Sequence, residues 1–203
     1  MMIKHILKKA ANFVGISSKR GTTFVSFVTP LTEICKHIPL DTIIEFGPGH
    51  STQIFLQHAP NTKILSFETD IKWYNTYKDK FDPDQVNVIY KKPGWDLKEI
   101  YAYGENFSLI FVDGGDRLSA LEVAYDLIGD VGLVFLHDAH REEYEPGIHK
   151  YPYVYCPERH SCILTRNKAL LETLKTAVPP DYSCNCQYCS SPERRAYFSQ
   201  YIS

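Results

Sequence analysis

Carboxylates end four apolar, strand-like runs, and this pattern is the feature of the sequence best suited to chemistry. The four runs end at Glu45, Glu68, Asp113 and Asp138. The carboxyl ends of parallel strands share one edge of a sheet, where α/β folds bind their ligands. A loop-capping role explains one such acid easily but four poorly. We therefore expect these acids to converge on a single site.

The segment that follows the first run predicts a ligand-binding loop. A short buried strand at 42–46 leads into a loop with two glycines, and a helix is expected to begin near Gln53. Glycine allows close backbone approach, and the N–H groups of a helix start favour an anion such as a carboxylate. Ser51 and Thr52 can cap this helix. The candidate binding residues of the loop are Gly47, Gly49, His50, Ser51 and Thr52.

The acids around this loop indicate which groups the ligand carries. Glu45 suits an amino group, and Glu68 can accept both hydroxyls of a ribose. Asp96, after the third strand, is a candidate for the amino group of adenine, and Asp113, at the end of the fourth, is a further candidate cofactor residue. A dinucleotide fingerprint would need a third glycine at position 52, which is Thr52. A carboxylate, an amine and a ribose together describe S-adenosylmethionine.

Strands alternate with helices through most of the chain. We expect five strands at 42–46, 63–68, 86–90, 108–113 and 131–138. Helices are expected at 70–80, from 95 and at 117–128. A strand pair at 151–156 and 161–166 and a helix at 168–177 should follow. This order predicts an α/β, Rossmann-like, doubly wound and mainly parallel sheet with a C-terminal antiparallel strand pair. The expected domains are an N-terminal helical extension at 1–40, the core at 41–178 and a cysteine-rich tail at 179–203.

The sequence resembles the class I S-adenosylmethionine-dependent methyltransferases in three features. These are the motif Glu45-Phe46-Gly47-Pro48-Gly49, the later Glu68 and the acid that ends the fourth strand. The resemblance covers roughly residues 40–140. It is closest to the plant polysaccharide O-methyltransferases that act on glucuronic acid. The segments that match are Phe46 to His50, Phe67 to Asp70 with Trp73, and Val134 to Asp138 with Arg141.

A second sugar-related likeness lies after the fourth strand. The loop Asp113-Gly114-Gly115-Asp116 resembles bacterial sugar methyltransferases. The two likenesses together imply methyl transfer to a hydroxyl of a sugar or polysaccharide. Two alternatives stay open, an O-methyltransferase with a small aromatic acceptor and a non-catalytic binding module that keeps the fold.

A sugar hydroxyl is a poor nucleophile, so its attack on a methyl group needs a base or a metal ion to take up the proton. The candidate catalytic residues are Asp113, His137, Asp138 and His140. Asp113, Asp138 and His140 could hold magnesium, manganese or cobalt. In magnesium-dependent catechol-type enzymes an Asn follows the second acid, whereas this chain has Ala139. A metal-free base, His137, Asp138 or His140, is the alternative.

Two arginines are candidates for orienting an anionic acceptor. Arg117 and Arg141 each follow one of the strand-end acids closely. A solvated charge is the commoner fate of such residues.

Five of the six cysteines lie in the last quarter of the chain. Cys184, Cys186 and Cys189 fall within six residues, and a fourth ligand from Cys156, Cys162 or His160 would complete a tetrahedral zinc site. Free thiols are the alternative, and disulfides are the least expected state in a cytosolic chain.

Composition bounds the remaining possibilities. A net charge of -2 gives no reason to expect nucleic acid as a partner. No apolar run approaches the roughly 20 residues that span a bilayer. The basic, amphipathic start from Met1 to Gly15 lacks the features of a signal peptide, so a cytoplasmic location is expected, with surface membrane contact as the alternative. The sequence does not indicate an oligomeric state.

Overall fold

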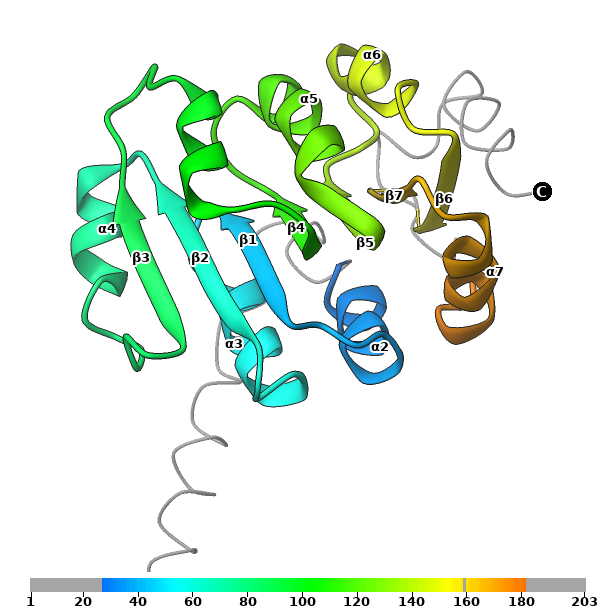
Figure 1. Cartoon of the computed structure of the whole chain (residues 1–203), viewed down its shortest axis with the longest axis horizontal. Coiled ribbons are helices and arrows are strands. Elements are labelled where there is room, and N and C mark those ends of the chain that lie inside the picture. The colour runs from blue at the N-terminus through cyan, green and yellow to red at the C-terminus, as the bar shows by residue number, and fades with distance from the viewer. Residues whose placement is uncertain (1–26, 159, 182–203) are drawn as a thin grey trace, which may run out of the picture.

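The protein forms one seven-stranded sheet in the order β3-β2-β1-β4-β5-β7-β6 (Figure 1). The computed structural model describes residues 27–158 and 160–181. Strands β1 to β5 are parallel, and β7 runs antiparallel to both β5 and β6. The bounds are β1 Thr42–Phe46, β2 Lys63–Glu68, β3 Val86–Tyr90, β4 Phe107–Val112, β5 Ile128–His137, β6 Tyr153–Glu158 and β7 Ser161–Thr165. The expected fold class is confirmed.

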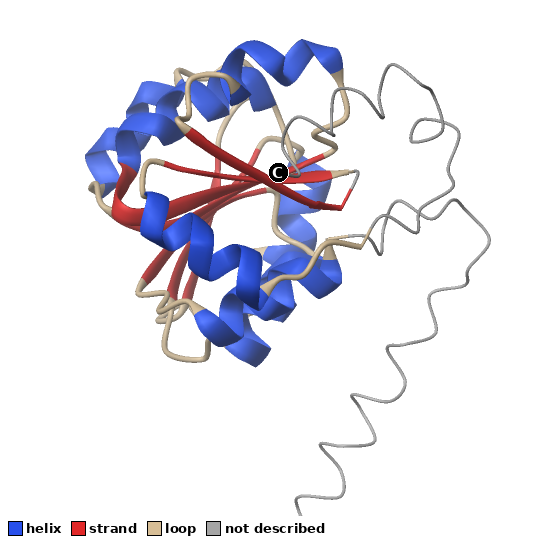
Figure 2. Ribbon diagram, turned by 90° about the vertical axis from the view of Figure 1, so that its right-hand side faces the viewer, coloured by secondary structure: helices blue, strands red, loops and turns tan. Residues whose placement is uncertain are grey.

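Helices cover both faces of the sheet, as Figure 2 shows. One apolar cluster joins the sheet to α2, α3 and α7, and a second joins its other face to η2, α5 and α6. The α-helices are α2 Val28–His37, α3 His50–His58, α4 Ile71–Tyr77, α5 Arg117–Leu127, α6 Glu145–Ile148 and α7 Lys168–Ala177. Two 3₁₀ helices are η2 Leu97–Tyr103 and η3 Glu142–Tyr144.

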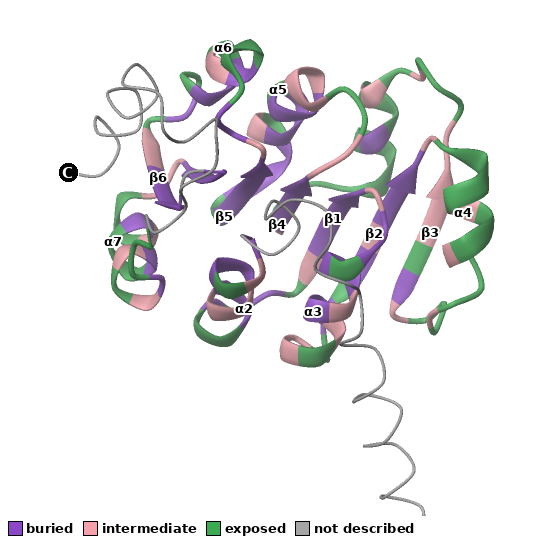
Figure 3. Ribbon diagram, turned by 180° about the vertical axis from the view of Figure 1, so that it is seen from behind, coloured by how far each residue is buried: buried purple, intermediate pink, exposed green. Residues whose placement is uncertain are grey.

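The central strands are buried on both faces, which explains why they read as near-continuous apolar runs (Figure 3). Ile43 and Ile44 of β1 are fully buried, as are the four residues from Leu133 to Leu136 in β5. This packing fixes the sheet edge at which the strand-end acids emerge.

The helix after β2 differs from the expectation. It spans Ile71–Tyr77 rather than residues 70–80 and has no buried residue. It packs on β2 and on the edge strand β3, so it meets less of the core than the helices over the central strands do. Trp73 is 47% exposed, and its indole N–H donates to the carbonyl of Pro48 at 2.6 Å. The tryptophan of the sequence motif thus supports the glycine loop from outside.

A disulfide links Cys156 and Cys162 across the β6–β7 hairpin. The expectation that these cysteines are thiols or metal ligands is therefore wrong. Their Cα atoms lie 4.3 Å apart, since adjacent antiparallel strands bring them opposite each other. Cys35 is a free, buried thiol. Cys184, Cys186 and Cys189, and the amphipathic start of the chain, lie outside the described residues, so the zinc site and the N-terminal helix stay predictions.

No helix among residues 27–158 and 160–181 is both long and apolar enough to cross a membrane. The expected domain bounds stay a prediction. Helix α2, which belongs to the expected N-terminal extension, packs into the same apolar cluster as β1.

Candidate functional site

A cavity of about 600 Å³ opens at the carboxyl edge of the parallel strands. Its walls come from the ends of β1 and β2 and from the loops that follow β3 and β4. Three predicted cofactor residues line it, namely Gly47, Glu68 and Asp96. This is the edge at which an open α/β sheet binds its ligand.

Two glycines shape the inner wall of this cavity. Gly47 has a φ of +93°, a conformation that side chains rarely adopt, and its N–H donates to the carbonyl of Phe67 at 2.9 Å. A Cβ on Gly114 would lie 3.0 Å from the carbonyl oxygen of Phe46. The loops after β1 and β4 therefore approach each other as closely as backbone allows.

Glu68 presents a carboxylate to the cavity in a fixed orientation. Its Oε1 accepts hydrogen bonds from the backbone N–H groups of Thr69 and Asp70 at 2.6 and 2.7 Å. The second oxygen keeps its lone pairs for a ligand. A carboxylate held in this way after β2 can accept both hydroxyls of a ribose.

The loop after β3 closes the cavity with the predicted residue Asp96 and with Trp95, which was not among the predicted site residues. Trp95 lies in the wall and stacks on Phe67, with ring centroids 5.4 Å apart. Asp96 caps η2, because its Oδ1 accepts from the N–H of Lys98 at 2.9 Å.

Glu45 lies behind the cavity wall and is fully buried. Its carboxylate accepts hydrogen bonds from three hydroxyls: that of Ser51, that of Thr52 at 2.7 Å and that of Ser66 at 2.8 Å. Burial raises the pKa of Glu45 to about 7, although these hydroxyls oppose the shift. Its contact with the amino group of a ligand stays a prediction.

The helix after the glycine loop begins earlier than expected. Helix α3 starts at His50, and Gly49 is its N-cap. Thr52 accepts from the N–H of Gly49 at 2.8 Å and donates to Glu45, so its hydroxyl ties the loop to β1. His50 is exposed. None of the predicted cofactor residues Glu45, Gly49, His50, Ser51 and Thr52 lines the cavity.

A histidine–aspartate pair lies at the ends of β4 and β5. Asp113 Oδ1 lies 2.7 Å from His137 Nδ1. Because a carboxylate accepts, Nδ1 carries the proton and Nε2 keeps a lone pair. Nε2 is buried and has no hydrogen-bond partner among the described residues. Burial lowers the pKa of His137, but the hydrogen bond and the negative charge of Asp113 prevail and raise it.

Asp138 turns the chain out of β5. Its φ is +58°, in a region that Asp tolerates better than most side chains. Its Oδ2 accepts from Arg117 and from Arg141, at 3.0 Å each. Burial opposes ionisation, but the positive charge that His137 carries when it is protonated, together with those of Arg117 and Arg141, lowers the pKa of Asp138. The carboxylate is thus held ionised at the strand end.

Arg117 and Arg141 differ in surroundings. The Arg117 side chain is 12% exposed and also donates to the carbonyls of His137 and Asp113 at 2.7 Å, so it fastens β4 to β5. The Arg141 side chain is 47% exposed. Arg141 is therefore the better placed of the two to meet an anionic acceptor, and this role stays a prediction.

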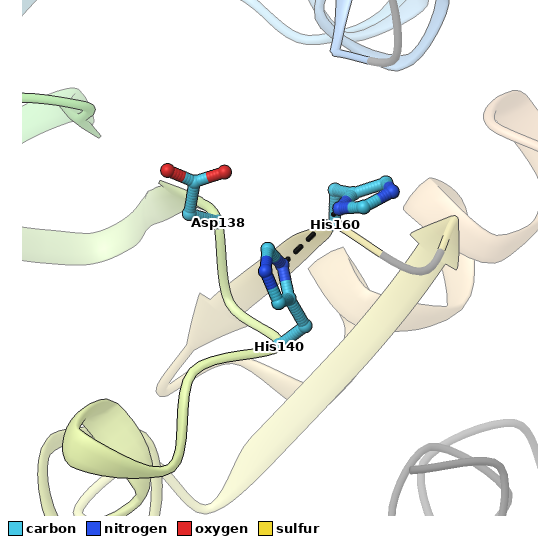
Figure 4. Close-up of side chains that lie close together, drawn as sticks. All are labelled: Asp138, His140 and His160. Atoms are coloured by element: carbon cyan, nitrogen blue, oxygen red, sulfur yellow. Dashed lines mark hydrogen bonds between the residues drawn. The ribbon is translucent and has the colours of Figure 1, made fainter. Parts of the chain in front are cut away.

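The predicted metal ligands fall into two groups. Asp113, His137 and Asp138 form one, and Asp138, His140 and His160 form the other. Figure 4 shows His140 on the chain that leaves β5 and His160 across from it, at the β6–β7 turn. Their Nδ1 atoms lie 3.1 Å apart. Asp138 belongs to both groups, whereas Asp113 and His140 belong to different ones. The three predicted ligands Asp113, Asp138 and His140 therefore do not form one group.

No protein-family model matches the sequence, and comparison with curated proteins finds no significant match. Solved structures do match. A methyltransferase-like protein from Silicibacter pomeroyi is 15% identical, with a TM-score of 0.57 over 79% of this chain and 98% of that chain. The O-methyltransferase from Bacillus cereus in complex with SAH is 18% identical, with a TM-score of 0.51 over 74% of this chain and 80% of that chain. The fold is the one that these proteins share.

Proposed function

We propose that the chain is an S-adenosylmethionine-dependent O-methyltransferase that acts on a hydroxyl of a sugar or polysaccharide. One observation carries the proposal. Asp113, the partner of His137, directly precedes Gly114, which lines the cavity that also holds Glu68. A nucleoside-binding carboxylate and a candidate base therefore lie at the same edge of the sheet, with Asp113 next in sequence to the cavity wall, although neither Asp113 nor His137 lines the cavity. The similarity in fold to the Bacillus cereus O-methyltransferase supports this reading.

The polar groups that line the cavity suit the cofactor. Glu68 would bind the ribose hydroxyls and Asp96 the adenine amino group, while Gly47 lets the backbone approach. Glu45 fixes this loop through three hydroxyls and would attract the ligand's amino group at short range. When bound, S-adenosylmethionine supplies an electrophilic methyl group on a sulfonium.

His137 is the residue we assign as the base. Asp113 holds its ring in the tautomer that leaves Nε2 able to accept a proton, the arrangement that general-base catalysis uses. The ring also packs edge-on against Phe27, with centroids 5.0 Å apart, which fixes its plane. His137 would take the proton from the acceptor hydroxyl, and Asp113 would stabilise the resulting imidazolium. Asp138 adds a second negative charge beside it.

Magnesium at Asp113 and Asp138 fits the site poorly. Asp113 Oδ1 is bound by His137 and lies 3.2 Å from Arg117, while Asp138 Oδ2 is bound by two guanidinium groups. Ala139, where catechol-type enzymes carry Asn, offers no ligand. We therefore propose proton transfer to a side chain at this pair.

A screen of labelled methyl transfer tests the proposed activity. The full chain would be given S-adenosylmethionine labelled in its methyl group, with candidate glycans in one set of reactions and small aromatic hydroxyl compounds in the other. The proposal expects label on glycans that carry uronic or neutral sugars. Label on the aromatic compounds alone would contradict the sugar assignment. Binding of the cofactor with no transfer to any hydroxyl would favour a non-catalytic module.

A further inference from the structure

We propose that Asp138, His140 and His160 bind a divalent transition-metal ion of the zinc or cobalt type. One ligand atom from each of these residues lies within 4.8 Å of the other two. Such a site would join the end of β5 to the β6–β7 turn, as Figure 4 shows. The inference rests on this ligand set and does not depend on methyl transfer.

The spacing of the two histidines matches that of ligands on one ion. Two imidazole nitrogens, each about 2.0–2.1 Å from a zinc ion, lie about 3.0–3.4 Å apart at ordinary coordination angles. The Nδ1 atoms of His140 and His160 are 3.1 Å apart. Their rings stand at 89° to each other, so both nitrogens can point at a common centre without the rings colliding.

The backbone holds both histidines in place. His160 N donates to Glu158 Oε2 at 2.7 Å, and the carbonyl of His160 accepts from the N–H of Ala139 at 2.8 Å. His137 pairs with Ser161 across β5 and β7, so the strand register itself sets the two turns opposite each other. His160 is fully buried and His140 is 8% exposed. A preorganised ligand set of this kind binds metal tightly.

Two carboxylate oxygens near the histidines are not engaged by the arginines. The two arginines bind Asp138 Oδ2, which leaves Oδ1 as a ligand. Glu158 is 6% exposed, and its Oε1 is buried with no hydrogen-bond partner in the part of the chain that the structure describes. The other oxygen of this side chain accepts from the N–H of His160, so Glu158 lies beside the proposed ligand set. Glu158 is therefore a buried acid whose location a bound cation would explain.

The donor types select the metal. Two imidazoles and one carboxylate suit zinc, cobalt, nickel or iron, whereas magnesium prefers oxygen ligands. Three protein ligands leave at least one coordination position open. The proposed centre is thus able to bind an exogenous oxygen atom from water or from a hydroxyl compound.

Metal titration of the full chain tests the site. Cys184→Ser, Cys186→Ser and Cys189→Ser would first be combined, since the tail thiols are a competing ligand set. After treatment with chelator, this triple variant would be titrated with Co²⁺ by absorption and with Zn²⁺ by calorimetry. We expect one equivalent of either ion and a visible cobalt spectrum without sulfur charge-transfer bands. No binding in this variant would overturn the proposal.

Histidine variants locate the bound ion. His140→Gln and His160→Gln should each weaken metal affinity by more than about 100-fold, the upper end of the loss seen when a supporting residue is removed. The exposed His37→Gln is the matched control and should bind metal unchanged. Unchanged affinity in either cluster variant would show that His140 and His160 only hydrogen bond to each other.

X-ray absorption identifies the ligands of the bound ion without any histidine replacement, so it does not depend on whether the histidine variants fold. The zinc-loaded triple cysteine variant keeps every histidine, so replacement of the buried His160 is avoided. The proposal expects scattering from two imidazoles together with a carboxylate oxygen. A spectrum without imidazole scattering would overturn it.

Discussion

At the residue scale, the site depends on carboxylates whose surroundings give them different tasks. Glu68 is oriented by two backbone amides and faces the cavity, whereas Glu45 is enclosed by three hydroxyls behind it. Asp113 orients a histidine, and Asp138 is held ionised by two arginines. The sequence predicts that these acids share one edge, because each ends a buried strand. It does not predict the pairing of Asp113 with His137 or of Asp138 with Arg117, because these partners come from other segments of the chain.

Replacing Asp113 tests the base. Asp113→Asn keeps the shape of the side chain but removes its negative charge and adds an N–H donor that can face Nδ1, so the His137 tautomer is no longer fixed. We expect turnover to fall by about 10²–10⁴-fold while cofactor affinity stays unchanged. Rates and calorimetric affinities of the two proteins provide the comparison. Asp126→Asn, which replaces an exposed carboxylate near the end of α5, is the control and should retain full turnover. Normal turnover in Asp113→Asn would remove His137 from its assigned role.

Glu45 predicts an unusual dependence of stability on pH. Its pKa is about 7 in the folded protein against a reference value of 4.5, so the folded state binds more protons than the unfolded state between these values. The contribution of Glu45 to the free energy of unfolding should therefore fall as pH rises from about 4.5 to 7, by up to roughly 1.4 kcal/mol per pH unit. Chemical denaturation across this range measures it.

Glu45→Gln cannot titrate and should lose this fall in stability with rising pH. Glu105→Gln, at an exposed position, should keep it. The account of the buried carboxylate would be refuted by equal pH slopes in the wild-type protein and Glu45→Gln.

At the scale of the elements, local patterns predicted the strands better than the contacts between them. Strands 42–46, 63–68 and 86–90 and the helix 168–177 are confirmed to the residue. The position of His160 next to His140 was not predicted, because it depends on β7 lying antiparallel beside β5. The sequence suggested His160 only as a zinc ligand with the tail cysteines. The stack of Trp95 on Phe67 likewise needs the sheet order, which local periodicity does not encode.

The disulfide should stabilise the β6–β7 hairpin modestly. Cys156 and Cys162 are six residues apart in sequence, and closing so short a loop removes little entropy from the unfolded chain. The chain-entropy relation gives about 2 kcal/mol for a loop of this length. Cys162→Ser should lower the free energy of unfolding by about that amount under oxidising conditions. Cys35→Ser is the comparison for loss of a buried thiol without loss of a bond. Equal stability of the wild-type protein with and without reductant would argue against the bond.

At the scale of the whole molecule, a doubly wound sheet brings a ligand cavity and a charged cluster to one edge. The fold is shared with methyltransferase structures at low identity, so the proposed activity has to be argued from the site and tested there. The composition had already made nucleic acid an unexpected partner, since the net charge is only -2. We expect the choice between a sugar and another acceptor to depend on residues outside this cavity, for which the exposed Arg141 is the candidate.

Calorimetry of cofactor binding tests the central claim most directly. S-adenosylmethionine and its demethylated product should both bind the full chain, and NAD should not. Glu68→Gln should weaken both affinities by at least about tenfold, because hydrogen bonds to a charged group contribute roughly 1.5–3 kcal/mol each. Glu99→Gln, an exposed carboxylate paired with Lys91, should leave both affinities unchanged. Binding of neither compound, or equal affinity in Glu68→Gln and the wild-type protein, would contradict the assignment of this cavity to S-adenosylmethionine.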